Sequence, residues 1–198
     1  MRHLLPINLT RQMRGETNLC WAAVTLAVAR YLRLSRPEIE ILNHPITEVC
    51  RISHEDPQEC RDQPRLISRT LNVQNVRVPS TRSREHGGVY VLKMSHKSAA
   101  DAIRLEVVDR ERPMLLQVSY YESAQLVHHV VIVGGYGVTI DGEIEVAIYD
   151  PMPYGELASR HHTRARPTWI RLADDMLIHG GVPSHLHRLK HPPLKHPL

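Results

Sequence analysis

The stretch "LVHHVVIVGGYG", residues 126–137, is an apolar run broken by a pair of histidines. Apart from that pair, residues 127–133 are all β-branched, which favours an extended strand, and "GGYG" predicts a turn after it. Successive side chains of a strand point to opposite faces. His128 and His129 are therefore expected on opposite faces of this strand, so at most one of them can point into a given cleft.

The rest of the second half of the chain has the same character. Its apolar runs are rich in Val, Ile and Tyr and are bounded by Gly, Pro and Asp-Gly, which is typical of strands joined by tight turns. We predict strands over residues 89–94, 114–120, 127–133, 144–149 and 168–172.

The first half favours helices. Asn18 can cap a helix that runs through Leu32, where small and apolar residues recur at helical spacing. Helices followed by strands predict an α+β fold, with an N-terminal helical lobe packed on a C-terminal antiparallel β-sheet or half-barrel and a site between them. Further helices are expected over residues 35–43, 62–71 and 98–112.

The composition is typical of a globular protein. It has 198 residues, 42% of them hydrophobic, and we expect one domain over residues 1–181. No stretch reaches the roughly 18 to 20 apolar residues of a membrane span, and the start lacks the apolar core of a signal peptide. We expect no membrane span, and a protein that is cytoplasmic or exported by a specialised route without a cleavable signal peptide.

The net charge of +4 comes from the C-terminal end. Residues 182–198 contain four prolines, four histidines and no acidic residue, and we expect a flexible basic tail. Zinc-finger or helix-turn-helix spacing and interleaved aromatic residues are missing, so no nucleic-acid partner is expected. The histidines of this end are a loose signal for metal binding, and we predict neither a metal nor a cofactor.

The three cysteines form an odd set. Cys50 and Cys60 could form a disulfide in an oxidising compartment or remain thiols in a reducing one. Cys20, in "ETNLCWAAV" (residues 16–24), stands apart and falls in the first turn of the predicted helix. Unpaired N–H groups and the helix dipole favour a thiolate there, although a cysteine among alanines can also be a small core residue.

A nucleophilic cysteine needs a base, and the base needs a group that orients it. The histidine pair supplies the base, and "IYDP" places Asp150 directly after the strand predicted over residues 144–149. Asp150 alone could be a turn residue. Together with Cys20 and a histidine it supplies the parts of a Cys-His-Asp triad.

"CWAA" at 20–23, "HVVIVGGYG" at 129–137 and "YDP" at 149–151 resemble the signature segments of papain-like cysteine peptidases, in particular the bacterial C39-like and C70-like branch. "CRDQPRLISRTL" at 60–71 and "ERPMLLQVSYYES" at 111–123 extend the likeness, which covers roughly residues 11–155. The resemblance implies a helical lobe and a β lobe, with the cysteine and histidine facing each other across a cleft.

The resemblance also implies roles for single residues. Cys20 is the nucleophile, His129 the base and Asp150 the group that orients it; the family spacing fits His129 better than the alternative, His128. Gln12 is the expected oxyanion donor, although family members place that glutamine closer to the cysteine. Trp21 and Asn18, beside the nucleophile, are the expected substrate-binding residues.

The implied function is hydrolysis of peptide or isopeptide bonds through an acyl-thioester, with a protein or peptide as the substrate. A bacterial effector or toxin and a leader-processing protease are the settings that this function suggests. Acyl transfer, deamidation and removal of a ubiquitin-like tag can use the same triad, and a catalytically silent peptide-binding module is a further alternative.

Overall fold

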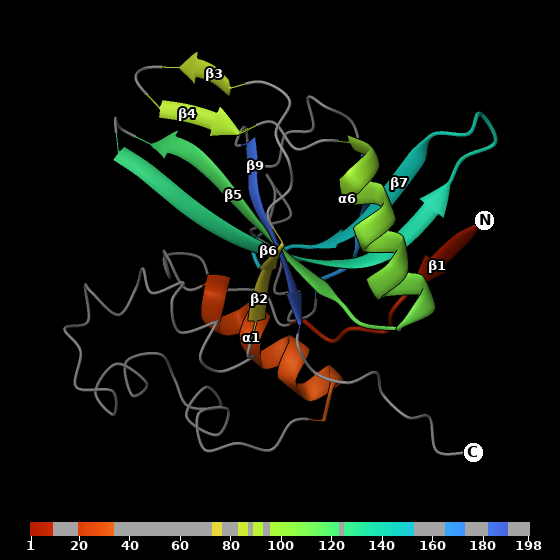
Figure 1. The fold of residues 1–198 in the computed structure, drawn as a ribbon. Coiled ribbons are helices and arrows are strands. Elements are labelled where there is room, and N and C mark those ends of the chain that lie inside the picture. Colours follow the sequence, from red (N-terminus) through yellow and green to blue (C-terminus); the bar gives the residue numbers. More distant parts are fainter. Residues whose placement is uncertain are drawn as a thin grey trace, which may run out of the picture.

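The computed structural model describes residues 1–9, 20–33, 73–76, 83–86, 89–92, 96–122, 125–152, 165–172 and 182–189. These residues form a mixed α+β fold built around one seven-stranded antiparallel sheet (Figure 1). Its strand order is β2-β9-β5-β6-β7-β8, and β1 pairs with β6. The helices expected over 35–43 and 62–71, together with Cys50 and Cys60, lie outside the described residues.

Strand β6 (Gln125–Val138) is the central strand of the sheet and pairs with β5, β7 and β1. β5 (Met114–Glu122) runs antiparallel along its first part, and β7 (Ile144–Tyr149) along its last part. β1 (Arg2–Leu4) also pairs with the last part of β6. The strands predicted over 114–120, 127–133 and 144–149 are therefore confirmed, and β6 is longer than predicted.

The sheet continues on both sides of this centre. β8 (Thr168–Arg171) pairs with β7, which confirms the strand predicted over 168–172. On the other side β9 (Val182–Leu189) lies between β5 and β2 (Val73–Val76). β3 (Ser83–His86) and β4 (Val89–Leu92) form a separate antiparallel pair. β4 agrees with the strand predicted over 89–94, of which residues 93 and 94 lie outside the described residues.

The expectation of a flexible tail from residue 182 is wrong for β9. Leu186 and Leu189 are buried in the core, and Leu186 pairs with Leu116 of β5. The two leucines are three residues apart among prolines, histidines and basic residues, so no strand alternation marks this segment in the sequence. Pairing with strands on both sides orders the segment.

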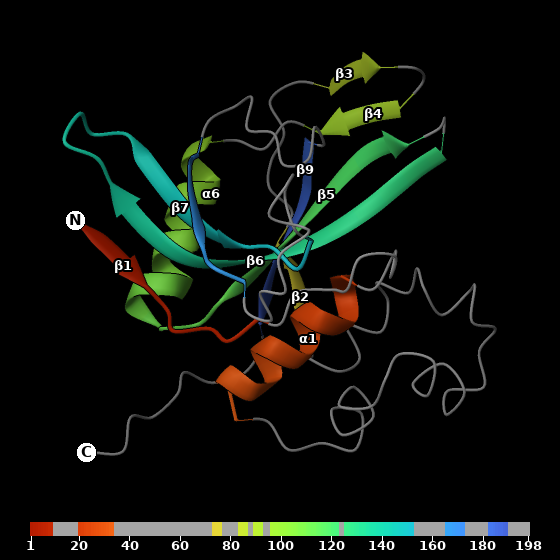
Figure 2. The same cartoon turned by 180° about the vertical axis from the view of Figure 1, so that it is seen from behind.

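Two helical segments cover the sheet (Figures 1 and 2). α1 (Cys20–Tyr31) contacts β6, and it confirms the helix predicted from the cap at Asn18. α6 (His96–Ile103) continues directly into η1 (Arg104–Asp109), a turn of π-helix that also contacts β6. The helix predicted over 98–112 is thus present, but it begins earlier and ends in π-helical form. No helix of the described segments has the length and apolarity needed to cross a membrane.

The "GGYG" motif lies inside β6 and is not the turn that the sequence predicted. A Cβ on Gly134 would come within 2.7 Å of Ile7 Cδ1, and one on Gly135 within 2.5 Å of the Ala147 Cβ. These glycines therefore allow neighbouring segments to approach the strand closely. The turn comes later, at Gly142, whose φ of 81° suits glycine.

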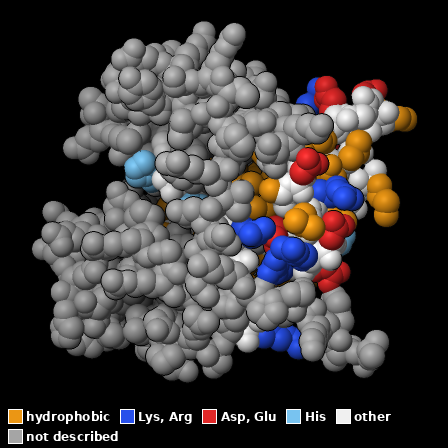
Figure 3. Space-filling model, viewed as in Figure 1, with side chains coloured by type: hydrophobic (Ala, Val, Ile, Leu, Met, Phe, Trp, Pro, Cys, Tyr) orange, Lys and Arg blue, Asp and Glu red, His pale blue; other side chains and the backbone are white. Residues whose placement is uncertain are grey.

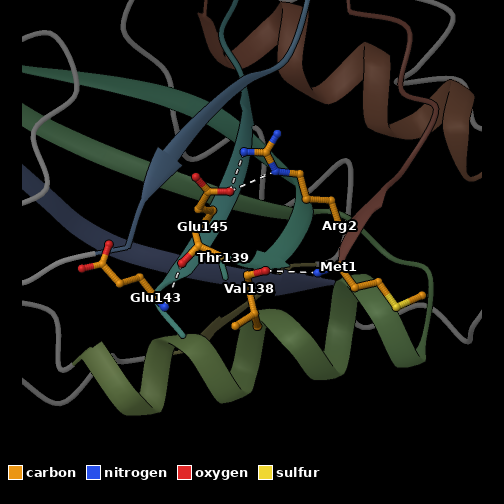
Figure 4. A network of polar contacts seen from close by, with 6 residues as sticks. All are labelled: Met1, Arg2, Val138, Thr139, Glu143 and Glu145. Atoms are coloured by element: carbon orange, nitrogen blue, oxygen red, sulfur yellow. Dashed lines mark hydrogen bonds and ion pairs between the residues drawn. The ribbon is translucent and has the colours of Figure 1, made fainter. Parts of the chain in front are cut away.

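Polar contacts at the surface hold β1 in place. Figure 3 shows basic and acidic side chains next to one another among the coloured residues of one face. Figure 4 shows the end of β1, where Arg2 forms an ion pair of 2.6 Å with Glu145 and the Met1 amino group donates to the Val138 carbonyl at 3.1 Å. Arg2 also stacks over the Trp169 ring at 4.7 Å. These contacts fasten β1 to β6, β7 and β8.

Candidate active site

Cys20 is the first residue of α1. The backbone N–H groups of a first helical turn have no partner within the helix, so the thiol lies where the helix dipole is positive. Its side chain is nevertheless buried, with 5% of the residue exposed. The proposed cap Asn18 and the proposed oxyanion donor Gln12 lie outside the described residues.

His129 lies in the middle of β6 and is only 1% exposed. Its Nε2 is 2.9 Å from Oδ1 of Asp150, the residue that follows β7. The same carboxylate oxygen accepts the backbone N–H of Met152 at 2.8 Å. Asp150 is therefore held by the turn that begins at Pro151. The sequence "YDP" is typical of such a turn.

Cys20 lies next to the His129 ring, and its interaction with the ring raises the pKa of His129. Because Asp150 occupies Nε2, the ring nitrogen that remains for the thiol is Nδ1. The structure thus brings together three side chains from the start of a helix, the middle of one strand and the end of the next. Cys20, His129 and Asp150 form one continuous chain of contacts.

The charge state of His129 follows from its neighbours. Burial alone lowers the pKa of His129, because the protein interior disfavours the charged ring. Hydrogen bonds to Asp150 and Cys20, and the charges of those two groups, outweigh burial and raise the pKa of His129 from 6.5 to about 9. At neutral pH the imidazole is therefore protonated, with one N–H for Asp150 and one for Cys20.

His128 lies on the opposite face of β6. Its Nδ1 is 3.0 Å from the Ser119 hydroxyl and 3.3 Å from Gln117 Nε2. Ser119 and Gln117 are both residues of β5, and Ser119 pairs directly with His128. The strand alternation expected from the sequence places His129, and not His128, next to Cys20.

Trp21 packs in the hydrophobic core and is 2% exposed, so a contact with substrate would require this part of the protein to open. Within the described segments, its indole Nε1 has no hydrogen-bond partner, and neither has Oγ1 of Thr25, one helical turn later. The predicted role of Trp21 in substrate binding stays a prediction.

The described residues contain no group of three or more His, Cys, Asp or Glu side chains that could hold a metal ion. The histidines at 161, 162, 191 and 196 lie outside them. Metal binding by the C-terminal end thus stays an open alternative.

Comparison with known proteins does not assign the chain to a family. No protein-family model matches the chain, and no curated protein matches it. Function has to be inferred from the chemistry that Cys20, His129 and Asp150 can perform.

Proposed function

We propose that the protein is a papain-like cysteine peptidase that hydrolyses peptide or isopeptide bonds. The observation that carries this proposal is the chain of contacts from Cys20 through His129 to Asp150. A thiol, a basic ring and a carboxylate in this order form the constellation that activates a nucleophile for acyl transfer. α1 packed on the antiparallel sheet agrees with that family's architecture, whose two-lobe form is part of the proposal.

The first half of the proposed reaction forms a thioester. His129 holds the proton of Cys20, so that thiolate and imidazolium stabilise each other. The thiolate attacks the carbonyl carbon of the substrate, and the negative charge moves to the carbonyl oxygen. The C–N bond then breaks as His129 gives its Nδ1 proton to the leaving amine.

The second half releases the acid product. Neutral His129 takes a proton from water, the hydroxide attacks the thioester carbonyl, and the C–S bond breaks to restore the thiolate. Asp150 accepts the Nε2–H throughout and keeps Nδ1 directed at the sulfur. In this role Asp150 orients the ring and stabilises its charged form.

Backbone geometry supplies one oxyanion donor. Cys20 begins α1, so its N–H has no partner from within that helix. We assign to it the first hydrogen bond to the developing oxyanion, and the proposed second donor is the Gln12 amide. Loss of a single donor of this kind lowers kcat by about 10²- to 10³-fold in other acyl-transfer enzymes.

The burial of the site favours a second candidate. Cys20 and His129 are nearly inaccessible, which is typical of a cysteine that serves as core packing. A catalytically silent peptide-binding module would keep this arrangement without using it. Deamidation and acyl transfer share the triad with hydrolysis and differ only in what attacks or leaves.

The test compares variants of the two adjacent histidines, because His129 belongs to the proposed site and His128 does not. Wild-type protein and the variants Cys20→Ala, His129→Gln and His128→Gln are incubated with a mixed library of synthetic peptides, and the products are identified by mass spectrometry. We expect cleavage by the wild type and by His128→Gln, and a loss of at least about 10²-fold in His129→Gln and Cys20→Ala.

The product mass separates the alternatives. Cleavage gives two shorter peptides, deamidation adds about one dalton, and acyl transfer joins two peptides. Undiminished cleavage by Cys20→Ala, or an equal loss in both histidine variants while circular dichroism shows them folded, would contradict the assignment. No reaction with any library peptide would favour the silent module.

A further inference from the structure

Tyr149 is the last residue of β7 and immediately precedes Asp150. It is buried, and its backbone pairs with Ile132 of β6. The position of the Asp150 carboxylate is therefore set by how firmly the end of β7 is held against β6. Tyr149 is held at two points, its hydroxyl and its ring.

The hydroxyl of Tyr149 donates a hydrogen bond to the Leu5 carbonyl at 2.5 Å. Leu5 is itself fixed, because its N–H donates to the Gly134 carbonyl at 2.8 Å. The Leu5 carbonyl also accepts the Ile7 N–H at 2.9 Å, which closes a tight turn around Pro6. The N-terminal segment therefore ties the end of β7 to β6.

The ring of Tyr149 packs on the position where Gly134 lacks a side chain. A Cβ there would lie 2.8 Å from Tyr149 Cε2 and 2.7 Å from Ile7 Cδ1, closer than such atoms approach in proteins. The register between β6 and β7 shifts between Val133 and Gly135, so Gly134 is the extra residue of a β-bulge. Bulges near functional sites change the direction of neighbouring side chains.

We propose that Tyr149 and Gly134 are positioning residues that fix the end of β7 and so place the Asp150 carboxylate against His129. The catalytic meaning of this placement rests on the proposed function. The contacts themselves do not, because they join Tyr149 to Leu5, Ile7 and Gly134 whatever reaction the site performs. A further support of Asp150, the Met152 N–H, lies on the turn that follows β7.

The proposal has a readout that fold stability alone does not change. Among the residues that the structure describes, Asp150 and Cys20 are titratable groups next to the His129 ring, and both raise its pKa. If the end of β7 moves, the hydrogen bond from His129 to Asp150 lengthens and the pKa of His129 falls toward the ordinary 6.5. A variant that is merely less stable keeps the wild-type value as long as it is folded.

The experiment measures the His129 pKa by NMR titration of histidine-labelled full-length protein, with the resonance assigned from a His129→Gln sample. The test variants are Tyr149→Phe, which removes only the hydroxyl, and Gly134→Ala. The control is Gly137→Ala on the same strand, because the three atoms nearest its new Cβ belong to Arg2, Trp169 and Met1 and none of them lies in β7.

We expect both test variants to lower the His129 pKa by about one unit or more, and the control to leave it unchanged. An unchanged pKa in folded Tyr149→Phe would overturn the proposal, and so would an equal fall in Gly137→Ala. Should Gly134→Ala not fold, Tyr149→Phe decides the outcome alone, because it adds no atom.

This result is separable from the proposed function because the titration requires no turnover. A lowered pKa in a protein that cleaves no peptide would support the positioning role and count against the peptidase. Peptide cleavage by the wild type, together with an unchanged His129 pKa in Tyr149→Phe, would support the peptidase and count against the positioning role. Where cleavage occurs, we expect Tyr149→Phe to lower kcat and leave KM unchanged.

Discussion

His129 is the residue on which the chemistry of the site depends. It is buried between a carboxylate and a thiol, and these partners outweigh the cost of burying its charge. His128 is the same side chain one residue earlier, bonded to Ser119 on the other face of the sheet. The difference between the two residues arises from strand alternation, which gives them separate surroundings.

The raised pKa of His129 predicts how stability depends on pH. A group whose pKa is higher in the folded protein stabilises it fully below the unfolded value of 6.5, and that contribution is lost as the pH rises through about 9. We expect the free energy of unfolding of the wild type to fall by about 3 kcal/mol more than that of His129→Gln over this range. Urea denaturation at several pH values measures both, and parallel curves would contradict the prediction.

Thr25 carries a buried hydroxyl that finds no hydrogen-bond partner among the described residues. An unsatisfied buried polar group costs free energy, so replacing the hydroxyl by a methyl group of similar shape should stabilise the fold. We expect Thr25→Val to raise the free energy of unfolding by about 1 kcal/mol, and Thr25→Ser to lower it. Denaturant titration tests this, and a destabilised Thr25→Val would show that a water molecule satisfies the hydroxyl.

At the scale of elements, η1 is held to the sheet by a buried carboxylate. Glu106 Oε1 accepts a hydrogen bond from Arg110 Nη1 at 2.6 Å and lies 3.7 Å from Arg188 Nε of β9. Its Oε2 forms an ion pair of 2.6 Å with Arg112 Nη2. Glu106 is 1% exposed. A single carboxylate thus joins the π-helical turn to the residues leading into β5 and to β9.

Removing this charge should be costly. Glu106→Gln removes the buried negative charge that faces the buried Arg112 guanidinium, and we expect a loss of about 3 to 5 kcal/mol in the free energy of unfolding. Asp109→Asn is the matched control on the same helix, because Asp109 is exposed and 3.8 Å from Arg104, and we expect a change below about 1 kcal/mol. Equal effects in thermal denaturation would refute a special role for Glu106.

At the scale of the whole molecule, access to Cys20 decides whether the site can work. With Cys20 at 5% exposure and His129 at 1%, a peptide reaches the thiol only after a local opening of the fold. Small reagents need a smaller opening than large ones. The thiol should therefore discriminate between reagents by size in the native protein.

We expect iodoacetamide to alkylate Cys20 at least about tenfold faster than a bulky fluorescein iodoacetamide in the native state, and at a similar rate in urea. Mass spectrometry of the peptide containing Cys20 measures both rates. Equal native rates would show that the thiol is open to solvent. A Thr25→Ser sample, which is changed in the same helix, controls for general loosening of α1.

Local sequence was enough to predict most of the described helices and strands and to single out Cys20, His129 and Asp150 as candidates for a site. Apolar periodicity indicated α1, β5, β6, β7 and β8, because the side-chain spacing of a helix or strand is a property of the local chain. The strand alternation also separated His128 from His129. The role of "GGYG" could not be read this way, since glycines that mark a turn in a sequence also allow close packing.

Only the tertiary structure decided what lies next to what. It placed β9 inside the sheet, set Glu106 among three arginines, and brought Tyr149 onto Gly134 and Leu5. It also joined Cys20, His129 and Asp150. The physical reason is the same in each case: these contacts link segments far apart along the chain, and local periodicity contains no information about which distant segments pair.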